Sequence, residues 1–149
     1  MAPIIVDISE AVAGLLAAAS LSQAFAIKRA WVEVASRDRM AAGDPILVTI
    51  LPGVLVMTAF DMKPRIAATW EVIVSITRAV QLTTASIDPI AGFVEEVAFL
   101  LAGKRLVGTP EGRVAQCVGL EARPVHDPEQ LAELKLYRAI VAVTYRVTQ

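Results

Sequence analysis

The sequence contains a single cysteine, Cys117, and a single histidine, His126, among its 149 residues. One cysteine excludes a disulfide within the chain, so nothing in the sequence indicates an oxidising compartment. One cysteine and one histidine also fall short of the four ligands that a structural zinc site needs. Cys117 lies in an apolar run and is expected to pack as a small core residue.

Aromatic residues and an excess charge of either sign are also scarce. Aromatic residues make up 5% of the chain, charged residues 19%, and the formal net charge is -1. Such a balance gives no general electrostatic attraction for nucleic acid. The sequence also lacks a glycine-rich phosphate loop, a nucleophile elbow and a paired-histidine metal motif. We therefore expect no catalytic site, no metal and no cofactor, and the chain is predicted not to be an enzyme.

Apolar residues are plentiful, at 56% of the chain with a mean hydropathy of +0.59. Even so, the uncharged run from Pro45 to Phe60 has 16 residues, whereas a membrane-spanning helix needs about 20. Pro52 and Gly53 also interrupt this run. The apolar N-terminal stretch contains acidic residues and lacks a basic start, so we expect an amphipathic helix there and not a signal peptide.

Helical spacing and start signals predict two main helices. A capping-box-like start at Asp7 predicts a helix that runs to about Ala19. In the second helix Asp88 is the expected N-cap, Pro89 suits the first helical position and Gly103 suits the residue after the last turn.

Two smaller expectations concern the helices. On the second helix Glu95 and Glu96 are predicted to face away from the core, since adjacent helical residues point in different directions. After His126, Asp127 as N-cap and Pro128 at the first position predict one or two helical turns. His126 beside Asp127 would suit acid–base chemistry, but a loop histidine before a helix cap explains the pair without it.

Alternation of apolar and polar residues, together with β-branched content, predicts about five strands. The expected strands are Arg29–Val34, Ile46–Leu51, Thr69–Val80, Arg113–Val125 and Leu134–Val147. Because most of them follow one another directly, we expect an α+β fold. Its antiparallel or mixed sheet of about five strands would pack against the two main helices on one side, in a single domain covering residues 1–149.

The apolar segment after Pro52–Gly53 is expected to lie in a long connection from Gly53 to Ala68. A monomer rarely leaves so contiguous an apolar patch in water, so we expect a subunit interface there. The alternative is another core strand within one subunit. The residues assigned to the interface are Val54, Leu55, Val56, Met57 and Phe60.

Four arginines on or beside the expected strands form a second candidate set. They are Arg29, Arg78, Arg138 and Arg146. They are candidates for lining a lumen, for touching phosphate or for facing a partner. Scattered strand arginines are more often ordinary surface or interface residues.

Several motifs in this order resemble a known family. The segments are "SQAFAIKRAWVEV" (Ser22 to Val34), "ILVTILPG", "IDPIAGFVEEVAFLLAGKRL" and "RPVHDPEQLAELKLYRAIVAVTYRV". Together they resemble the tail terminator and neck (head–tail joining) proteins of long-tailed bacteriophages. The sequence departs from that pattern at two tyrosine positions, which are occupied here by Trp31 and His126.

The resemblance implies a structural protein. Members of that class are α+β domains without a catalytic site that assemble as a ring, commonly a hexamer, through which DNA passes without sequence-specific binding. It implies a virion protein of the tail or neck, assembled in the host cytoplasm. Its partners would be further copies of itself, the tail tube protein and a neck or head-completion protein, with no membrane involved.

Three alternatives stay open at this point. The first is another head–tail connector. The second, from a different class, is a small cytoplasmic oligomeric enzyme with a site between subunits near His126. The third is a peripheral membrane protein that inserts Val54 to Phe60, although Asp61 beside this run disfavours anionic lipid.

Overall fold

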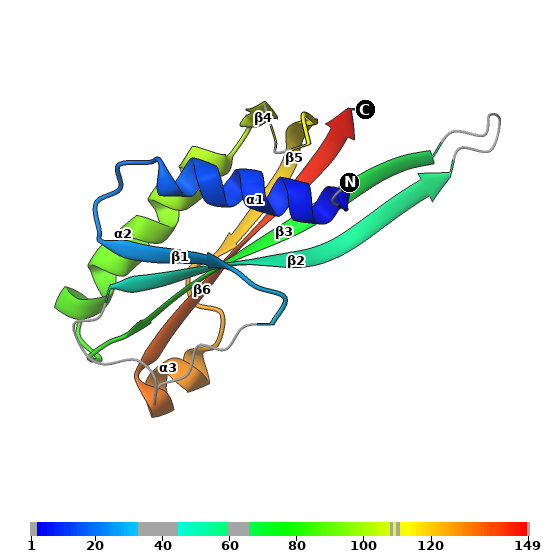
Figure 1. Cartoon of the computed structure of the whole chain (residues 1–149). Coiled ribbons are helices and arrows are strands. Elements are labelled where there is room, and N and C mark those ends of the chain that lie inside the picture. The colour runs from blue at the N-terminus through cyan, green and yellow to red at the C-terminus, as the bar shows by residue number, and fades with distance from the viewer. Residues whose placement is uncertain (1–2, 33–44, 60–65, 108, 110, 149) are drawn as a thin grey trace.

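The described part of the computed structural model contains three helices and six strands (Figure 1). It covers residues 3–32, 45–59, 66–107, 109 and 111–148. In chain order the elements are α1 (Ile4–Ala17), β1 (Phe25–Arg29), β2 (Ile46–Ala59), β3 (Ile66–Ala79), α2 (Thr84–Leu101), β4 (Arg105–Val107), β5 (Val114–Arg123), α3 (Pro128–Leu134) and β6 (Leu136–Thr148).

The six strands form one mixed sheet in the order β1-β2-β3-β6-β5-β4. Only β1 and β2 run parallel, and the other neighbours are antiparallel. The predicted α+β class and mixed sheet are therefore confirmed, but the strand count was one too low. The missing strand is β4, whose three residues are too short to show an alternating pattern.

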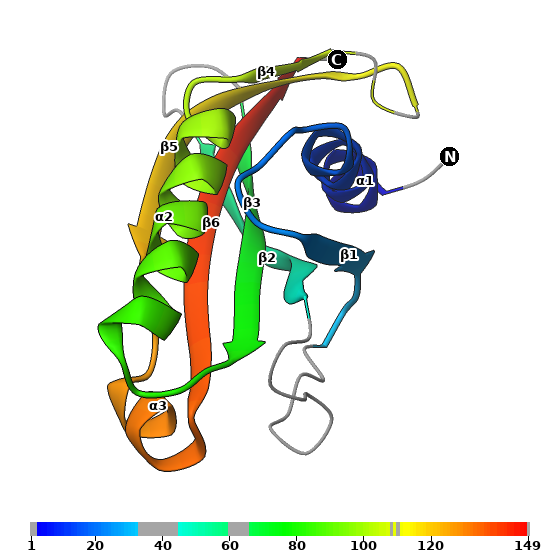
Figure 2. The same ribbon diagram turned by 90° about the vertical axis from the view of Figure 1, so that its left-hand side faces the viewer.

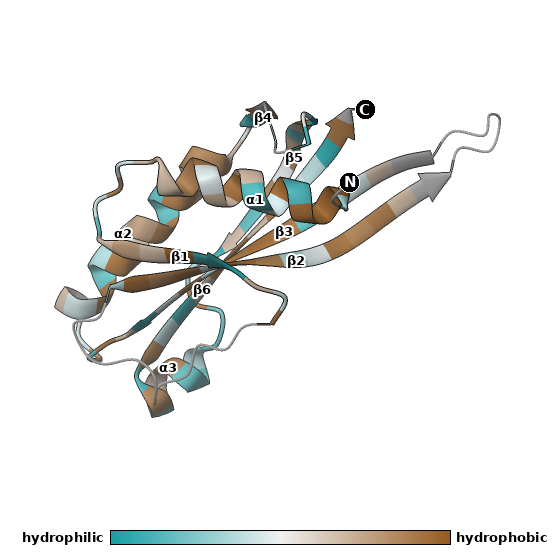
Figure 3. Ribbon diagram, in the orientation of Figure 1, coloured by the Kyte–Doolittle hydropathy of each residue, from teal (hydrophilic) through white to brown (hydrophobic). Residues whose placement is uncertain are grey.

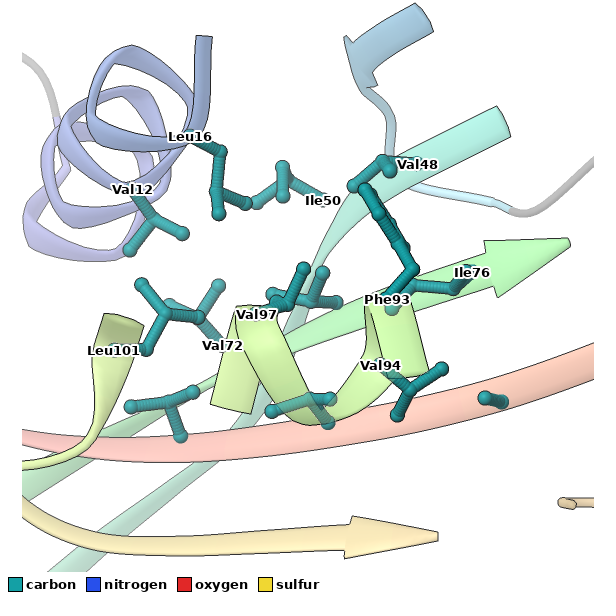
Figure 4. Close-up of a cluster of buried hydrophobic side chains, with 14 of the residues drawn as sticks. Val12, Leu16, Val48, Ile50, Val72, Ile76, Phe93, Val94, Val97 and Leu101 are labelled. Atoms are coloured by element: carbon teal, nitrogen blue, oxygen red, sulfur yellow. The ribbon is translucent and has the colours of Figure 1, made fainter. Parts of the chain in front are cut away.

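The core lies between one face of this sheet and helices α1 and α2, which both pack against that face (Figure 2). Alternate residues of the central strands enter it, as predicted for Val72, Val74 and Ile76 of β3, which are fully buried. Phe93 of α2 lies between the two layers (Figure 4). Its ring packs at a tilt against that of Phe25 of β1, with centroids 5.5 Å apart.

Strand β6 shows the predicted alternation most clearly. Tyr137, Ala139, Val141, Val143 and Tyr145 are fully buried on the helix-covered face. The residues that alternate with them, from Arg138 to Arg146, point to the opposite face and are only partly buried or exposed. This pattern is expected for a central strand that is covered by helices on one side.

Both main helices begin earlier than predicted. Helix α1 starts at Ile4, so Asp7 lies inside the first turns and does not cap the helix. Helix α2 starts at Thr84, because the Thr83 side chain accepts a hydrogen bond from the backbone N–H of Ser86 and caps the helix there. Pro89 therefore lies within α2 and not at its first position.

Other helix predictions fare better. Gly103 follows α2 with a positive φ of 67°, the left-handed conformation expected of a glycine just after a helix. The Asp127 side chain accepts hydrogen bonds from the backbone N–H groups of Glu129 and Gln130, as predicted for α3. Glu96, however, does not simply face solvent: it accepts bonds from the hydroxyl and backbone N–H of Ser22 and ties the α1–β1 connection to α2.

The first strand is also displaced from its prediction. It runs from Phe25 to Arg29, so the predicted strand Arg29–Val34 overlaps it by one residue. Pairing with β2 determines where β1 begins and ends, because Phe25 lies opposite Ile46 and Arg29 lies opposite Ile50. The end of the predicted strand, at residues 33 and 34, lies outside the described residues.

Candidate subunit interface

Strands β2 and β3 continue beyond the rest of the sheet as a two-stranded ribbon. Strand β6 pairs with β3 as far as Thr69, opposite Arg146. Pairing between β2 and β3 goes on past that level, to Ala59 opposite Ile66. Figure 1 shows this extension leaving the body of the molecule. We call residues 54–59 and 66–70 the β2–β3 ribbon.

The predicted long connection from Gly53 to Ala68 is therefore wrong. Most of that segment is strand, and Pro52–Gly53 does not end β2. Pairing shifts at this point, with Pro52 opposite Val72 and then Leu55 opposite Trp70, so β2 holds one residue more than β3. Gly53 and Val54 therefore lie opposite the single residue Glu71 and form a β-bulge directly after Pro52. The sequence signal allowed a bulge here as an alternative to a turn.

The ribbon exposes a run of large apolar side chains. The exposed fractions are 58% for Val54, 51% for Leu55, 51% for Val56 and 59% for Met57. Figure 3 shows this part of β2 as hydrophobic along its length. Successive strand residues point to opposite faces, so Val54 to Met57 place apolar side chains on both faces of the ribbon. These exposures rule out the alternative of a core strand within one subunit for these four residues, whereas Phe60 lies outside the described residues.

Gly53 allows the bulge to pack closely against β3. A Cβ atom placed on Gly53 would contact the Glu71 side chain, at 2.9 Å from Cγ and 3.0 Å from Cβ. These atoms lie near the strand backbone and cannot swing away as the end of a long side chain can. The ribbon's departure from the sheet therefore depends on having no side chain at this position.

Gly53→Ala is expected to lower the free energy of unfolding by about 1–3 kcal/mol through overpacking against Glu71. Gly92→Ala is the matched control, because a Cβ at Gly92 meets nothing within 4 Å and the position is helical. That change should stabilise the protein by about 0.5–1 kcal/mol. Urea unfolding of both variants measures the difference, and equal effects would contradict the role given to Gly53.

The four candidate arginines are spread over separate places. Arg29 pairs with Glu10 of α1. Arg78 lines a hollow of about 380 Å³ near the start of α2 with Gln23 and Ser86. Arg138 and Arg146 alternate with the buried residues of β6 and so share the face away from the helices.

The structure therefore brings only two of these four residues to one surface. Arg138 and Arg146 are eight residues apart on a strand, which corresponds to about 26 Å. A single basic patch formed by all four side chains is not present. The pair on β6 stays a prediction for a lumen or partner-facing position.

His126 lies beside a hollow of about 170 Å³ that Glu71, Glu121 and Arg123 help to line. Its backbone N–H donates to the carbonyl oxygen of Arg138 at 2.9 Å. The hollow is smaller than the roughly 300–1,000 Å³ typical of small-molecule sites.

Cys117 does not line this hollow. Its thiol donates a hydrogen bond to the Gly119 carbonyl oxygen at 3.6 Å. In the described part of the chain, no three Cys, His, Asp or Glu side chains gather as metal ligands.

Sequence reasoning missed a buried polar group with several partners, the Asp7 carboxylate. It accepts hydrogen bonds from the Thr109 hydroxyl at 2.6 Å and the Glu111 backbone N–H at 2.9 Å, and an ion pair from Arg113 at 3.1 Å. Burial raises the pKa of Asp7, but these three donors together bring it below its ordinary value. The partners follow Asp7 by 102 to 106 positions, so no local pattern could reveal them.

Comparison with known proteins supports the fold. No family model and no curated protein matches the sequence. A chain from the virion of a native gene transfer agent (GTA) particle has a similar structure, with a TM-score of 0.55 over 98% of each chain and 16% sequence identity. At this identity the likeness shows a shared fold.

Among the described helices, none is long and apolar enough to cross a membrane.

Proposed function

We propose that this protein is a structural virion component that assembles as a ring through the β2–β3 ribbon. The observation that carries the proposal is the run Val54 to Met57, four large apolar side chains held in strand conformation and more than half exposed. A second copy that covers this run would remove it from water. The shared fold with a chain of the GTA virion supports a virion role.

The shape of the molecule favours a ring over a two-fold dimer. The ribbon leaves the sheet on the β1–β2 side, whereas α2 lies over the β6–β5 side (Figures 1 and 2). A contact between two different surfaces of identical subunits is heterologous, and it closes into a ring when the rotation between subunits permits. By the resemblance of its motifs, we assign six subunits to this ring.

In more detail, we propose that the ring is a tail terminator. It would cap the tail tube, contact the tail tube protein on one face and a neck or head-completion protein on the other, and let DNA pass through its centre. It would act in the virion tail or neck after assembly in the host cytoplasm. A different head–tail connector is the second candidate, because the fold and the ribbon suit both.

The test is the solution mass of the purified protein by light scattering, with negative-stain images of the same fraction. Six copies of a 15.9 kDa chain would give a mass of about 95 kDa and particles with a central hole. A protein that stays monomeric at high concentration would contradict the ring. A compact dimer without a hole would contradict it equally.

A further inference from the structure

The outer edge of β2 is only half covered. Strand β1 pairs with β2 from Ile46 to Ile50, and Ala30 N–H donates to the Ile50 carbonyl oxygen at 3.0 Å. From Leu51 to Ala59, no described residue pairs with that edge. Unpaired N–H and C=O groups along a strand edge are a template for another strand.

The opposite end of the sheet has the same feature. Strand β4 covers β5 from Val114 to Gln116, and Cys117 N–H donates to the Lys104 carbonyl oxygen at 3.2 Å. From Gly119 to Arg123, the outer edge of β5 has no strand partner among the described residues. Figure 2 shows β4 beside only one end of β5.

The apolar side chains of the ribbon are too few to form a ring contact alone. One large aliphatic side chain removes on the order of 100 Å² from water when it is fully buried. Four side chains that are about half exposed therefore supply on the order of 200 Å², against about 800 Å² per partner in a stable interface. The contact must extend over neighbouring surface, and the free edge of β2 adjoins the ribbon directly.

Strand direction and charge select the partner edge. Strand β2 is antiparallel to β3, β3 to β6 and β6 to β5, so β2 and β5 of one subunit run in opposite directions. Across one subunit Leu51 lies level with Glu121 and Leu55 with Cys117. Subunits that follow each other around an axis to which the strands are tilted would bring the two uncovered segments together antiparallel. The free segment of β2 carries no charge, while Glu121 and Arg123 of β5 already pair with each other at 3.2 Å. Pairing the β2 edge with the β5 edge therefore buries no charged side chain that lacks an oppositely charged partner.

We propose that residues Leu51–Ala59 of β2 in one copy pair antiparallel with residues Gly119–Arg123 of β5 in the next copy, so that the sheet continues from subunit to subunit. This inference rests on the proposed ring and names the surfaces that form it. The incoming strand takes the position along β2 that β1 leaves after Ala30. Trp31, which is 62% exposed at that point, lies beside the incoming strand and adds apolar area to the contact.

The outer edge of β1 suits this role less well. It is only five residues long and ends in Lys28 and Arg29. Lysine on an edge strand is a common device against the addition of further strands. The uncharged segment of β2 has no such protection apart from Pro52, which lacks an N–H group.

Disulfide trapping tests the pairing. In a Cys117→Ala background, Leu55→Cys is combined in turn with Val118→Cys, Leu120→Cys and Ala122→Cys, which cover neighbouring registers. Facing residues on paired strands have Cβ atoms roughly 4.5–5.5 Å apart, so oxidation of the ring fraction should give a covalent ladder for at least one pair. Leu55→Cys alone and Leu55→Cys with Ala26→Cys on the β1 edge are the controls, and both should stay uncrosslinked.

The outcomes separate this inference from the ring itself. Rings without a crosslink in any of the three pairs, or with a crosslink from Leu55→Cys alone, would overturn the strand pairing and leave the ring intact. A monomer by light scattering would overturn both. Amide exchange of the unmodified protein gives a second readout, since both edge segments should exchange at least about tenfold more slowly in the ring than in diluted subunits. Unchanged exchange in both segments would also overturn the pairing.

Discussion

Asp7→Asn should lower the free energy of unfolding by about 3–5 kcal/mol, because it removes the charge of a buried carboxylate that accepts from the largely buried Arg113 guanidinium and from two other donors. The Asp7 side chain is fully buried and that of Arg113 is 12% exposed. The amide of asparagine would also place an N–H donor among groups that themselves donate, namely the Thr109 hydroxyl and the Glu111 backbone N–H. Urea unfolding monitored by circular dichroism measures the loss.

Glu10→Gln is the matched control on the same helix. Glu10 pairs with Arg29 at the surface, where the side chains are 45% and 30% exposed. Removing such a pair costs about 0–1 kcal/mol. If both variants lose the same small amount, the Asp7 cluster does not hold α1 to the β4–β5 loop in the way described.

The same cluster predicts how stability depends on pH. The folded-state pKa of Asp7 lies below its unfolded value, which is about 3.9. Its contribution is therefore fully present above that value and is lost as the pH falls through the folded-state pKa. The gap in unfolding free energy between the wild type and Asp7→Asn should be constant near neutral pH and shrink below about pH 4. A gap that does not change in acid would contradict the assigned charge of Asp7.

Met57→Asp should abolish assembly while leaving the subunit folded. Met57 is 59% exposed on the ribbon, so an aspartate there stays hydrated in the free subunit and changes its stability by no more than about 0.5 kcal/mol. In the assembled ring the same charge would lie unpaired in a desolvated contact. We expect the dissociation constant between subunits to rise by about 100-fold or more.

Light scattering across a dilution series measures this shift, and a thermal melt of the same sample reports the fold. Leu82→Asp is the control, because Leu82 is 50% exposed but precedes α2 and lies outside the ribbon. It should assemble like the wild type. Rings that form normally from Met57→Asp would place the interface elsewhere, and an unfolded variant would show that the ribbon is needed for the fold.

Local signals predicted the parts of this fold that local chemistry determines. Asp127 caps α3 because its carboxylate reaches N–H groups two and three residues later, and Gly103 ends α2 because it adopts a positive φ. The alternation in β3 and β6 follows from the pleat of a strand covered by helices on one face. Such features need only neighbouring residues to be recognised.

The errors arose where distant contacts override a local signal. Asp7 has the spacing of a helix start, but its carboxylate binds Thr109 and Arg113 from inside the helix. Pro52–Gly53 has the composition of a turn, yet pairing with β3 on both sides leaves a bulge there. Beyond it Val54 to Met57 are exposed, and their role as a subunit interface stays a prediction. Their extended conformation depends on the partner strand, which the sequence does not reveal.

Strand order in the sheet has a consequence for how the chain is made. Strand β6 comes after every other strand in the sequence but lies in the middle of the sheet, between β3 and β5. The partners of Asp7 likewise follow it by more than a hundred residues. A ribosome adds about 5–20 residues per second, so for several seconds β2 and β3 are present without the strand that completes their core. During that time the ribbon's apolar side chains are available to any neighbouring nascent chain. Folding of this subunit must therefore await the C-terminal part of the sequence.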